Sequence, residues 1–182
     1  FGMLDPYLRC IPADGGCDEG AAYWNMAAGS LLDCLELMAE AGLNCWDEPK
    51  LRNMLRFPLL MSLGNGYFAN FADCDARPVM YGERLQRAGE LLRDAALTAM
   101  GQNLRGQPTD CIGDVPHFSR LLQRLFHPVG AGQTAADTQD TLLPDLQVRI
   151  IRRNGWTLCI KGGYNGESHN HNDVGSLMVY VD

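Results

Sequence analysis

The stretch QVRIIRRNGWTLCIK, residues 147–161, decides the fold class because its pattern is that of a β-hairpin. Apolar and polar residues alternate with a period of two around Asn154-Gly155, a dipeptide that favours a two-residue hairpin turn. A third strand-like segment covers residues 176–181. Three strands make a poor sheet by themselves, so we expect the strand region to be cut short at Asp182.

Upstream of the hairpin, the apolar residues follow the period of a helix. They recur every three or four positions over residues 20–41, 48–62 and 82–100, which predicts three amphipathic helices. Pro58 should bend or interrupt the second of these helices. A shorter fourth helix is predicted after Pro116, because proline suits the first helical position.

The segment between the two patterns, residues 128–140, is rich in Gly, Ala, Thr and Asp and has no apolar period. It reads as a linker or an exposed loop. The chain is therefore predicted to be α+β, with a helical part over residues 1–142 and an antiparallel strand part over residues 143–182. Within the helical part, Gly64-Asn65-Gly66 predicts a turn, and residues 67–71 predict a short strand or loop.

Composition excludes several classes of protein. The 182 residues are 46% hydrophobic and 20% charged, which predicts a packed core and argues against global disorder. The net charge of −7 argues against a nucleic-acid backbone as the main partner, although a local cationic pocket for an anionic ligand remains compatible with it. No apolar run is long enough to span a bilayer, and no signal-peptide pattern opens the chain.

Cysteine usage bears on the compartment and on metal motifs. The count of seven is odd, and no two cysteines form a C-x-x-C pair, so zinc ribbons and thioredoxin-like motifs are absent. This usage favours a reducing, cytoplasmic compartment over a periplasmic or secreted location. The chain begins at Phe1 rather than at a methionine, so we expect it to be a fragment or a processed product.

The segment SHNHNDVGS, residues 168–176, is the densest group of chemically active side chains. On an extended backbone His169, His171 and Asp173 share one face. Paired imidazoles beside a carboxylate suit metal binding, proton transfer or carboxylate recognition, and we favour a functional role. The alternative is a polar loop before a strand, with the amide of Asn170 and its neighbours capping backbone groups.

A second candidate is DGGCDEGAAYW, residues 14–24. Its three glycines permit tight turns and the close approach of a ligand. Glu19 and Tyr23 are four positions apart, so they can share one face of the helix start, with Tyr23 pointing into a cleft. The alternative is a buried tyrosine with a satisfied hydroxyl group. Trp24 can stack on a sugar ring, but its place on the apolar stripe favours core packing.

Three segments together resemble the heparinase II/III-like polysaccharide lyase family. They are PADGGCDEGAAYW at residues 12–24, NFADCD at residues 70–75, and KGG followed by HNHNDVGS over residues 161–176. The resemblance implies an incomplete α/α toroid, ending within residues 1–142, followed by the first antiparallel strands of a β-sandwich. The family's Asn-His element is not found before Tyr23, and the sandwich would continue past the last residue, as expected of a truncated chain.

The resemblance also implies a function, the cleavage of uronate-containing glycans by β-elimination. Tyr23 would be the general acid/base, and His169 a second proton carrier or the group that binds the substrate carboxylate. His171 matches a position that ligates structural zinc in some relatives, with the other ligands after the end of this chain; no organic cofactor is implied. The partners would be an anionic polysaccharide or oligosaccharide, the rest of the parent chain and possible further copies. Substrate binding would involve Glu19, Trp24 and Asn170.

Two functions from other classes remain open. In a metal-dependent hydrolase, His169, His171 and Asp173 would bind an ion that activates water. In a non-catalytic carbohydrate-binding module, the glycan would bind without turnover. Asp73 and Asp75, which lie between the two motifs, are interpreted as loop caps rather than as catalytic groups.

Overall fold

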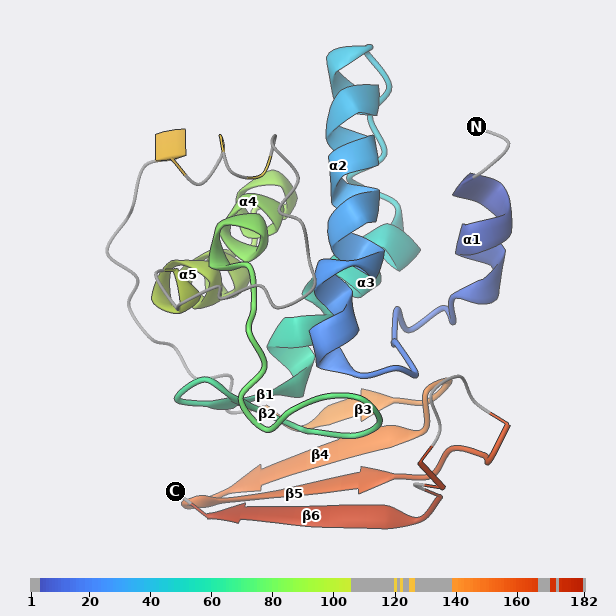
Figure 1. Ribbon diagram of the computed structural model, residues 1–182, viewed down its shortest axis with the longest axis vertical. Coiled ribbons are helices and arrows are strands. Elements are labelled where there is room, and N and C mark those ends of the chain that lie inside the picture. Colours follow the sequence, from blue (N-terminus) through green and yellow to red (C-terminus); the bar gives the residue numbers. More distant parts are fainter. Residues whose placement is uncertain are drawn as a thin grey trace. The chain divides into compact units, whose positions relative to one another are not determined.

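The protein is a mixed α+β chain of helices and antiparallel sheet in the computed structural model (Figure 1). This confirms the coarse fold class predicted from the change of period. Contacts divide the chain into two compact units, one made of Phe1–Pro78 with Asp137–Asp182 and the other of Val79–Ala136. The structure describes residues 4–105, 120, 122, 125–126, 139–166, 171–172 and 174–181.

The first unit begins with α1 (Leu4–Cys10) and two elements where one helix was predicted over residues 20–41. A 3₁₀ helix η1 (Ala21–Asn25) precedes α2 (Ala27–Glu40), so the prediction of a continuous α-helix is wrong. The first turn is tighter than an α-turn because the N–H of Met26 donates to the carbonyl only three residues back, at 3.0 Å.

The predicted apolar stripe and the predicted end of α2 are both confirmed. The helix stops where Gly42 adopts a φ of 84°. The N–H of Gly42 donates to the carbonyl of Ala39 at 3.0 Å, and that of Leu43 to Met38 at 2.9 Å, which together form a Schellman motif. The buried stripe residues are Trp24, Ala28, Leu31 and Leu35.

Helix α3 (Pro49–Met61) runs through Pro58 without ending there. Proline has no N–H, so the carbonyl of Met54, four residues earlier, loses its helical partner. The indole Nε1–H of Trp24 donates to that carbonyl at 3.0 Å. Trp24 and Met54 are only 1% and 2% exposed. The tryptophan thereby satisfies a buried acceptor that the proline would otherwise leave unpaired.

A small hairpin follows α3. Strands β1 (Ser62–Gly64) and β2 (Tyr67–Phe68) pair antiparallel. The turn between them has positive φ at Asn65 (51°) and Gly66 (77°), as a type I′ turn requires. The predicted turn is confirmed, and the segment after it contains a strand of two residues.

The larger sheet is four-stranded and antiparallel, in the order β3-β4-β5-β6. Its strands are β3 (Thr141–Leu143), β4 (Val148–Arg153), β5 (Trp156–Lys161) and β6 (Ser176–Val181). The Asn154-Gly155 turn joins β4 to β5 as predicted, with φ of 30° and 86°. Three strands were expected; β3 was missed because three residues are too few to show a period of two.

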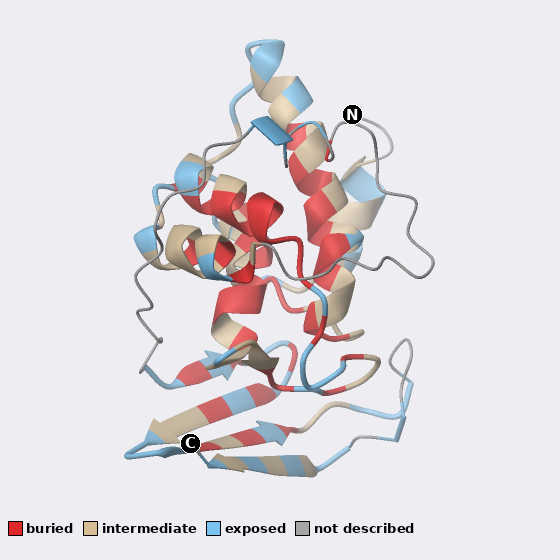
Figure 2. Ribbon diagram, turned by 60° about the vertical axis from the view of Figure 1, so that its left-hand side comes forward, coloured by how far each residue is buried: buried red, intermediate tan, exposed pale blue. Residues whose placement is uncertain are grey.

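The two faces of this sheet differ in burial (Figure 2). On the face toward α2 and α3, Arg152 of β4 donates through Nη2 to the carbonyls of Leu60 and Ser62, at 3.1 and 2.9 Å. The arginine therefore binds the carbonyl end of α3, where a positive charge is favourable. The opposite face carries exposed apolar side chains: Leu142, Trp156, Leu177, Val179 and Val181.

The second unit contains α4 (Gly82–Leu92) and α5 (Ala95–Leu104), where one helix was predicted over residues 82–100. The prediction is wrong because Arg93 adopts a left-handed conformation (φ 54°) and Asp94 starts a new helix. The Asp94 carboxylate accepts the N–H of Leu97 at 3.0 Å, an N-cap bond. None of the described helices is long and apolar enough to cross a membrane.

Candidate functional site

The glycine-rich segment before η1 is fastened to the sheet by Asp14. One carboxylate oxygen of Asp14 accepts the N–H groups of Asp145 and Leu146, at 2.8 and 3.0 Å, in the turn between β3 and β4. The other oxygen accepts the N–H of Gly16 at 2.9 Å. Asp14 therefore joins segments 131 residues apart by satisfying backbone donors that neither strand can pair.

The close approach at the first two glycines is made by protein and not by a ligand, which corrects the interpretation drawn from the sequence. A Cβ atom at Gly15 would lie 2.3 Å from the backbone nitrogen of Met54 in α3. At Gly16 it would lie 2.8 Å from Cβ of Leu146. Gly15 also has a φ of 73°. Both positions need glycine for chain packing.

Gly20 brings the loop that contains NFADCD against the start of η1. Its φ is 93°, and a Cβ atom there would lie 2.6 Å from the carbonyl oxygen of Phe71 and 2.8 Å from Cβ of Cys74. Backbone N–H groups at the start of η1, those of Ala21 and Ala22, point to the Cys74 sulfur and oppose the rise in pKa that its burial causes. Between Phe71 and Cys74, this loop carries one ionisable side chain, the carboxylate of Asp73.

Tyr23, the predicted general acid/base, is half-buried in η1 beside two carboxylates. Burial raises the pKa of its phenol above the ordinary 10.0, and the negative charges of Asp73 and Glu19 raise it further. A phenol in these surroundings keeps its proton at neutral pH, so it is suited to donate a proton. Glu19 lies in the turn before η1, which begins at Ala21, so the predicted sharing of one helix face by Glu19 and Tyr23 stays a prediction.

His171 contacts the same loop. Its Nε2 atom lies 2.5 Å from Oδ1 of Asp73, and the side chains of His171 and Asp73 are 57% and 30% exposed. The Asp73 carboxylate is therefore the residue that joins the two sequence motifs, since it contacts His171 and acts electrostatically on Tyr23. Asp73 was interpreted as a loop cap, because sequence spacing gives no sign of a contact between residues so far apart.

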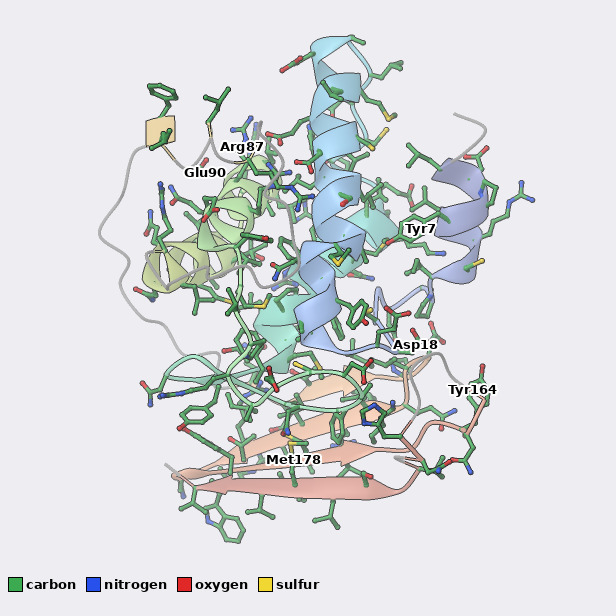
Figure 3. The ribbon with its side chains drawn as sticks, viewed as in Figure 1. Tyr7, Asp18, Arg87, Glu90, Tyr164 and Met178 are labelled. Atoms are coloured by element: carbon green, nitrogen blue, oxygen red, sulfur yellow. The ribbon has the colours of Figure 1, made fainter. Side chains whose placement is uncertain are left out.

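A second tyrosine adjoins this cluster from α1. Burial raises the pKa of Tyr7 to about 12, with further contributions from Cys17 and Glu19. Among the described residues its buried hydroxyl group has no hydrogen-bond partner. Figure 3 shows Tyr7 on α1 and Asp18 in the loop that leads to η1. Tyr7 carries no motif, so its place beside Glu19 was not expected.

The other predicted site residues have different outcomes. The burial of Trp24 and its bond to Met54 support the packing interpretation and leave no open face for a sugar ring. Glu19 is half-buried next to Tyr23. His169 and Asn170 lie outside the described residues, as does Asp173. The predicted meeting of Tyr23 with His169 therefore stays a prediction.

The donor atoms near His171 suit zinc in kind, because imidazole nitrogen and carboxylate oxygen are common zinc ligands. In the part of the chain that the structure describes, however, no three His, Cys, Asp or Glu side chains gather as a metal site would require. His171 and Asp73 are a pair only. Zinc at His171 thus stays a prediction from the resemblance.

Comparison with known proteins adds no family. No protein-family model matches the chain, and no curated protein matches it. The likeness to heparinase II/III-like lyases therefore rests on the sequence segments quoted above and stays a prediction.

Proposed function

We propose that this chain carries part of the active site of a polysaccharide lyase that cleaves uronate-containing glycans by β-elimination. One observation carries the proposal. Asp73 contacts His171 and lies close enough to Tyr23 to raise its pKa, so the two motifs of the resemblance share one acid–base neighbourhood.

The reaction requires three chemical roles. A base removes the weakly acidic C5 proton, a positive group or hydrogen-bond donor stabilises the charge that develops on the adjacent carboxylate, and an acid protonates the leaving oxygen at C4. Tyr23 with its raised pKa fits the acid role directly, because its phenol is neutral before the reaction. The base role and the carboxylate-binding role then fall to the histidine motif, with His169 as the candidate.

The surrounding charges support this division of roles. Glu19 and Asp73 place negative charge around Tyr23, which disfavours the phenolate that a tyrosine base would need. The same charges repel an anionic substrate unless a cation offsets them. Zinc, if bound by His171, would serve a structural role, and no step of the reaction is assigned to it.

A metal-dependent hydrolase is the second candidate. The pairing of an imidazole with a carboxylate, seen between His171 and Asp73, also occurs around catalytic zinc and favours this alternative. The products distinguish the two. A lyase leaves an unsaturated uronate that absorbs in the near ultraviolet, whereas a hydrolase adds water and leaves no such double bond. A binding module would give neither product.

The test is turnover of uronate-containing oligosaccharides by the complete enzyme that contains this chain, followed by near-ultraviolet absorbance. Tyr23→Phe removes only the hydroxyl group, so it should lower turnover by roughly 100-fold or more, the usual scale for a general acid/base. Its stability should change by about 1 kcal/mol or less. The matched control is Tyr164→Phe in the loop after β5, where the side chain is 63% exposed and points outward (Figure 3).

The control variant should keep the turnover of the unmodified protein. Normal formation of unsaturated product by Tyr23→Phe would contradict the assignment of Tyr23 as the acid. Products without the ultraviolet signal, formed only when zinc is added, would favour the hydrolase instead.

A further inference from the structure

Asp73 and His171 form the contact that joins the two motifs, and the loop that carries Asp73 is packed closely against Gly20. Phe71 and Cys74 pack against Gly20 so closely that no side chain fits between them. Ala72, directly before Asp73, has a φ of 54°, a left-handed conformation that a non-glycine residue adopts only where its surroundings hold it there. The loop therefore fixes the backbone from which the Asp73 carboxylate reaches out.

The more exposed partner of the pair is His171. It is 57% exposed against 30% for Asp73, and it reaches Asp73 from the segment that precedes β6. A histidine that exposed has several rotamers available, and an imidazole must face its reactant with a defined nitrogen to act as a proton carrier or ligand. The contact to Asp73 selects one orientation.

We propose that Asp73 is a positioning residue for His171: it accepts the hydrogen bond from Nε2–H and leaves Nδ1 as the imidazole atom that acts on a proton or a metal ion. A carboxylate only accepts hydrogen bonds, so the proton of a neutral imidazole must lie on Nε2 and the lone pair on Nδ1. The inference deepens the proposed function, and its catalytic consequence rests on that function.

The contact between the two side chains is direct. Nε2 of His171 lies 2.5 Å from Oδ1 of Asp73, so no further atom fits between the imidazole and the carboxylate. Carboxylate–imidazole pairs orient histidines at many metal and catalytic sites, and losing the carboxylate typically costs 10–100-fold in affinity or activity.

The first test does not depend on activity. Nitrogen-15 NMR of the histidine rings, with the proton exchange of each ring N–H measured, reports whether the Nε2–H of His171 is hydrogen-bonded. In the unmodified chain this proton should exchange slowly with water, and in Asp73→Ala at least tenfold faster. Asp75→Ala, an exposed carboxylate two positions along the same loop, is the control and should leave the exchange unchanged.

The second test uses turnover in the same variants. Asp73→Ala should lower kcat about 10-fold or more with little change in KM, because orientation is lost while the binding groups remain, and Asp75→Ala should not. Fast exchange of the Nε2 proton in the unmodified chain would overturn the inference, and so would an unchanged kcat in Asp73→Ala when Tyr23→Phe is inactive. Slow exchange in a chain without any lyase activity would support the positioning role and overturn the proposed function alone.

Discussion

Trp24 and Pro58 should depend on each other for stability, because the indole replaces the N–H that the proline lacks. Trp24→Phe removes the donor at 3.0 Å from the Met54 carbonyl. A buried carbonyl left without a partner costs about 1–3 kcal/mol. The smaller ring forfeits about 1 kcal/mol of apolar burial. The expected loss in the free energy of unfolding is therefore about 2–4 kcal/mol.

The structure makes a sharper prediction for the double variant. Pro58→Ala returns an N–H four residues after Met54, where it can donate to the same carbonyl. In that background Trp24→Phe should cost only the packing loss, about 1 kcal/mol. The coupling energy between the two positions should thus be about 1–3 kcal/mol, above the roughly 0.5 kcal/mol expected for independent sites.

The measurement is urea unfolding of the four chains of the cycle, followed by circular dichroism because two of them lose a fluorophore. The slopes should agree, so that shifted midpoints report stability. Trp156→Phe is the control, since that indole is 58% exposed, and it should change stability by less than about 0.5 kcal/mol. Additive effects of Trp24→Phe and Pro58→Ala would refute the reasoning.

Two further predictions concern carboxylates that hold the sheet. Asp14→Ala should destabilise the chain by about 1–3 kcal/mol, because three backbone N–H groups lose their acceptor; in the same urea assay Asp47→Ala, at an exposed position, should be nearly neutral. The hydrogen bonds of Arg153 and of the Arg152 N–H lower the pKa of Asp140 to about 2. Because the pKa is about 4 in the unfolded chain, stability should fall as pH drops from about 4 to 2, and Asp140→Asn should flatten this dependence in that window. An unchanged pH profile in Asp140→Asn would show that other groups cause the acid sensitivity.

The elements that local pattern controls were predictable from the sequence. Period two and an Asn-Gly turn placed β4 and β5 to within a residue, and α2 ends within a residue of the predicted boundary at residue 41. The errors have a common cause. The break at Arg93-Asp94 depends on a left-handed residue and an N-cap, and the period-3.6 pattern of residues 82–100 continues across them. An Asp immediately before the apolar residues of α5 was the signal that could have found it.

Long-range bonds account for what the sequence did not predict. The sequence predicted that Pro58 would bend or interrupt the helix. The group that replaces the missing N–H, the Trp24 indole, lies in another element and could not be identified from local sequence. The glycines at 15 and 16 looked like a ligand cradle because α3 and the β3–β4 turn that fill the space come later in the chain. In both cases the residue type correctly indicated an unusual local backbone. The group that packs or bonds there comes from a distant part of the chain, so only the fold identifies it.

The candidate site shows the same limit in its chemistry. The sequence identified Tyr23 and His171 as residues capable of acid–base chemistry. It did not identify Asp73 as the charged group near both of them. Burial raises the pKa of the phenol and the Asp73 carboxylate raises it further, and the same carboxylate contacts Nε2 of the imidazole. An acid needs a group that disfavours its ionised form, and a histidine needs a partner that fixes one nitrogen. A single aspartate meets both needs only if Gly20 lets its loop approach η1 closely. Gly20→Ala should therefore impair the site, because the added Cβ atom would displace the loop that carries Asp73. Among the three glycines of residues 14–24, Gly20 is thus the one that we connect with the proposed chemistry.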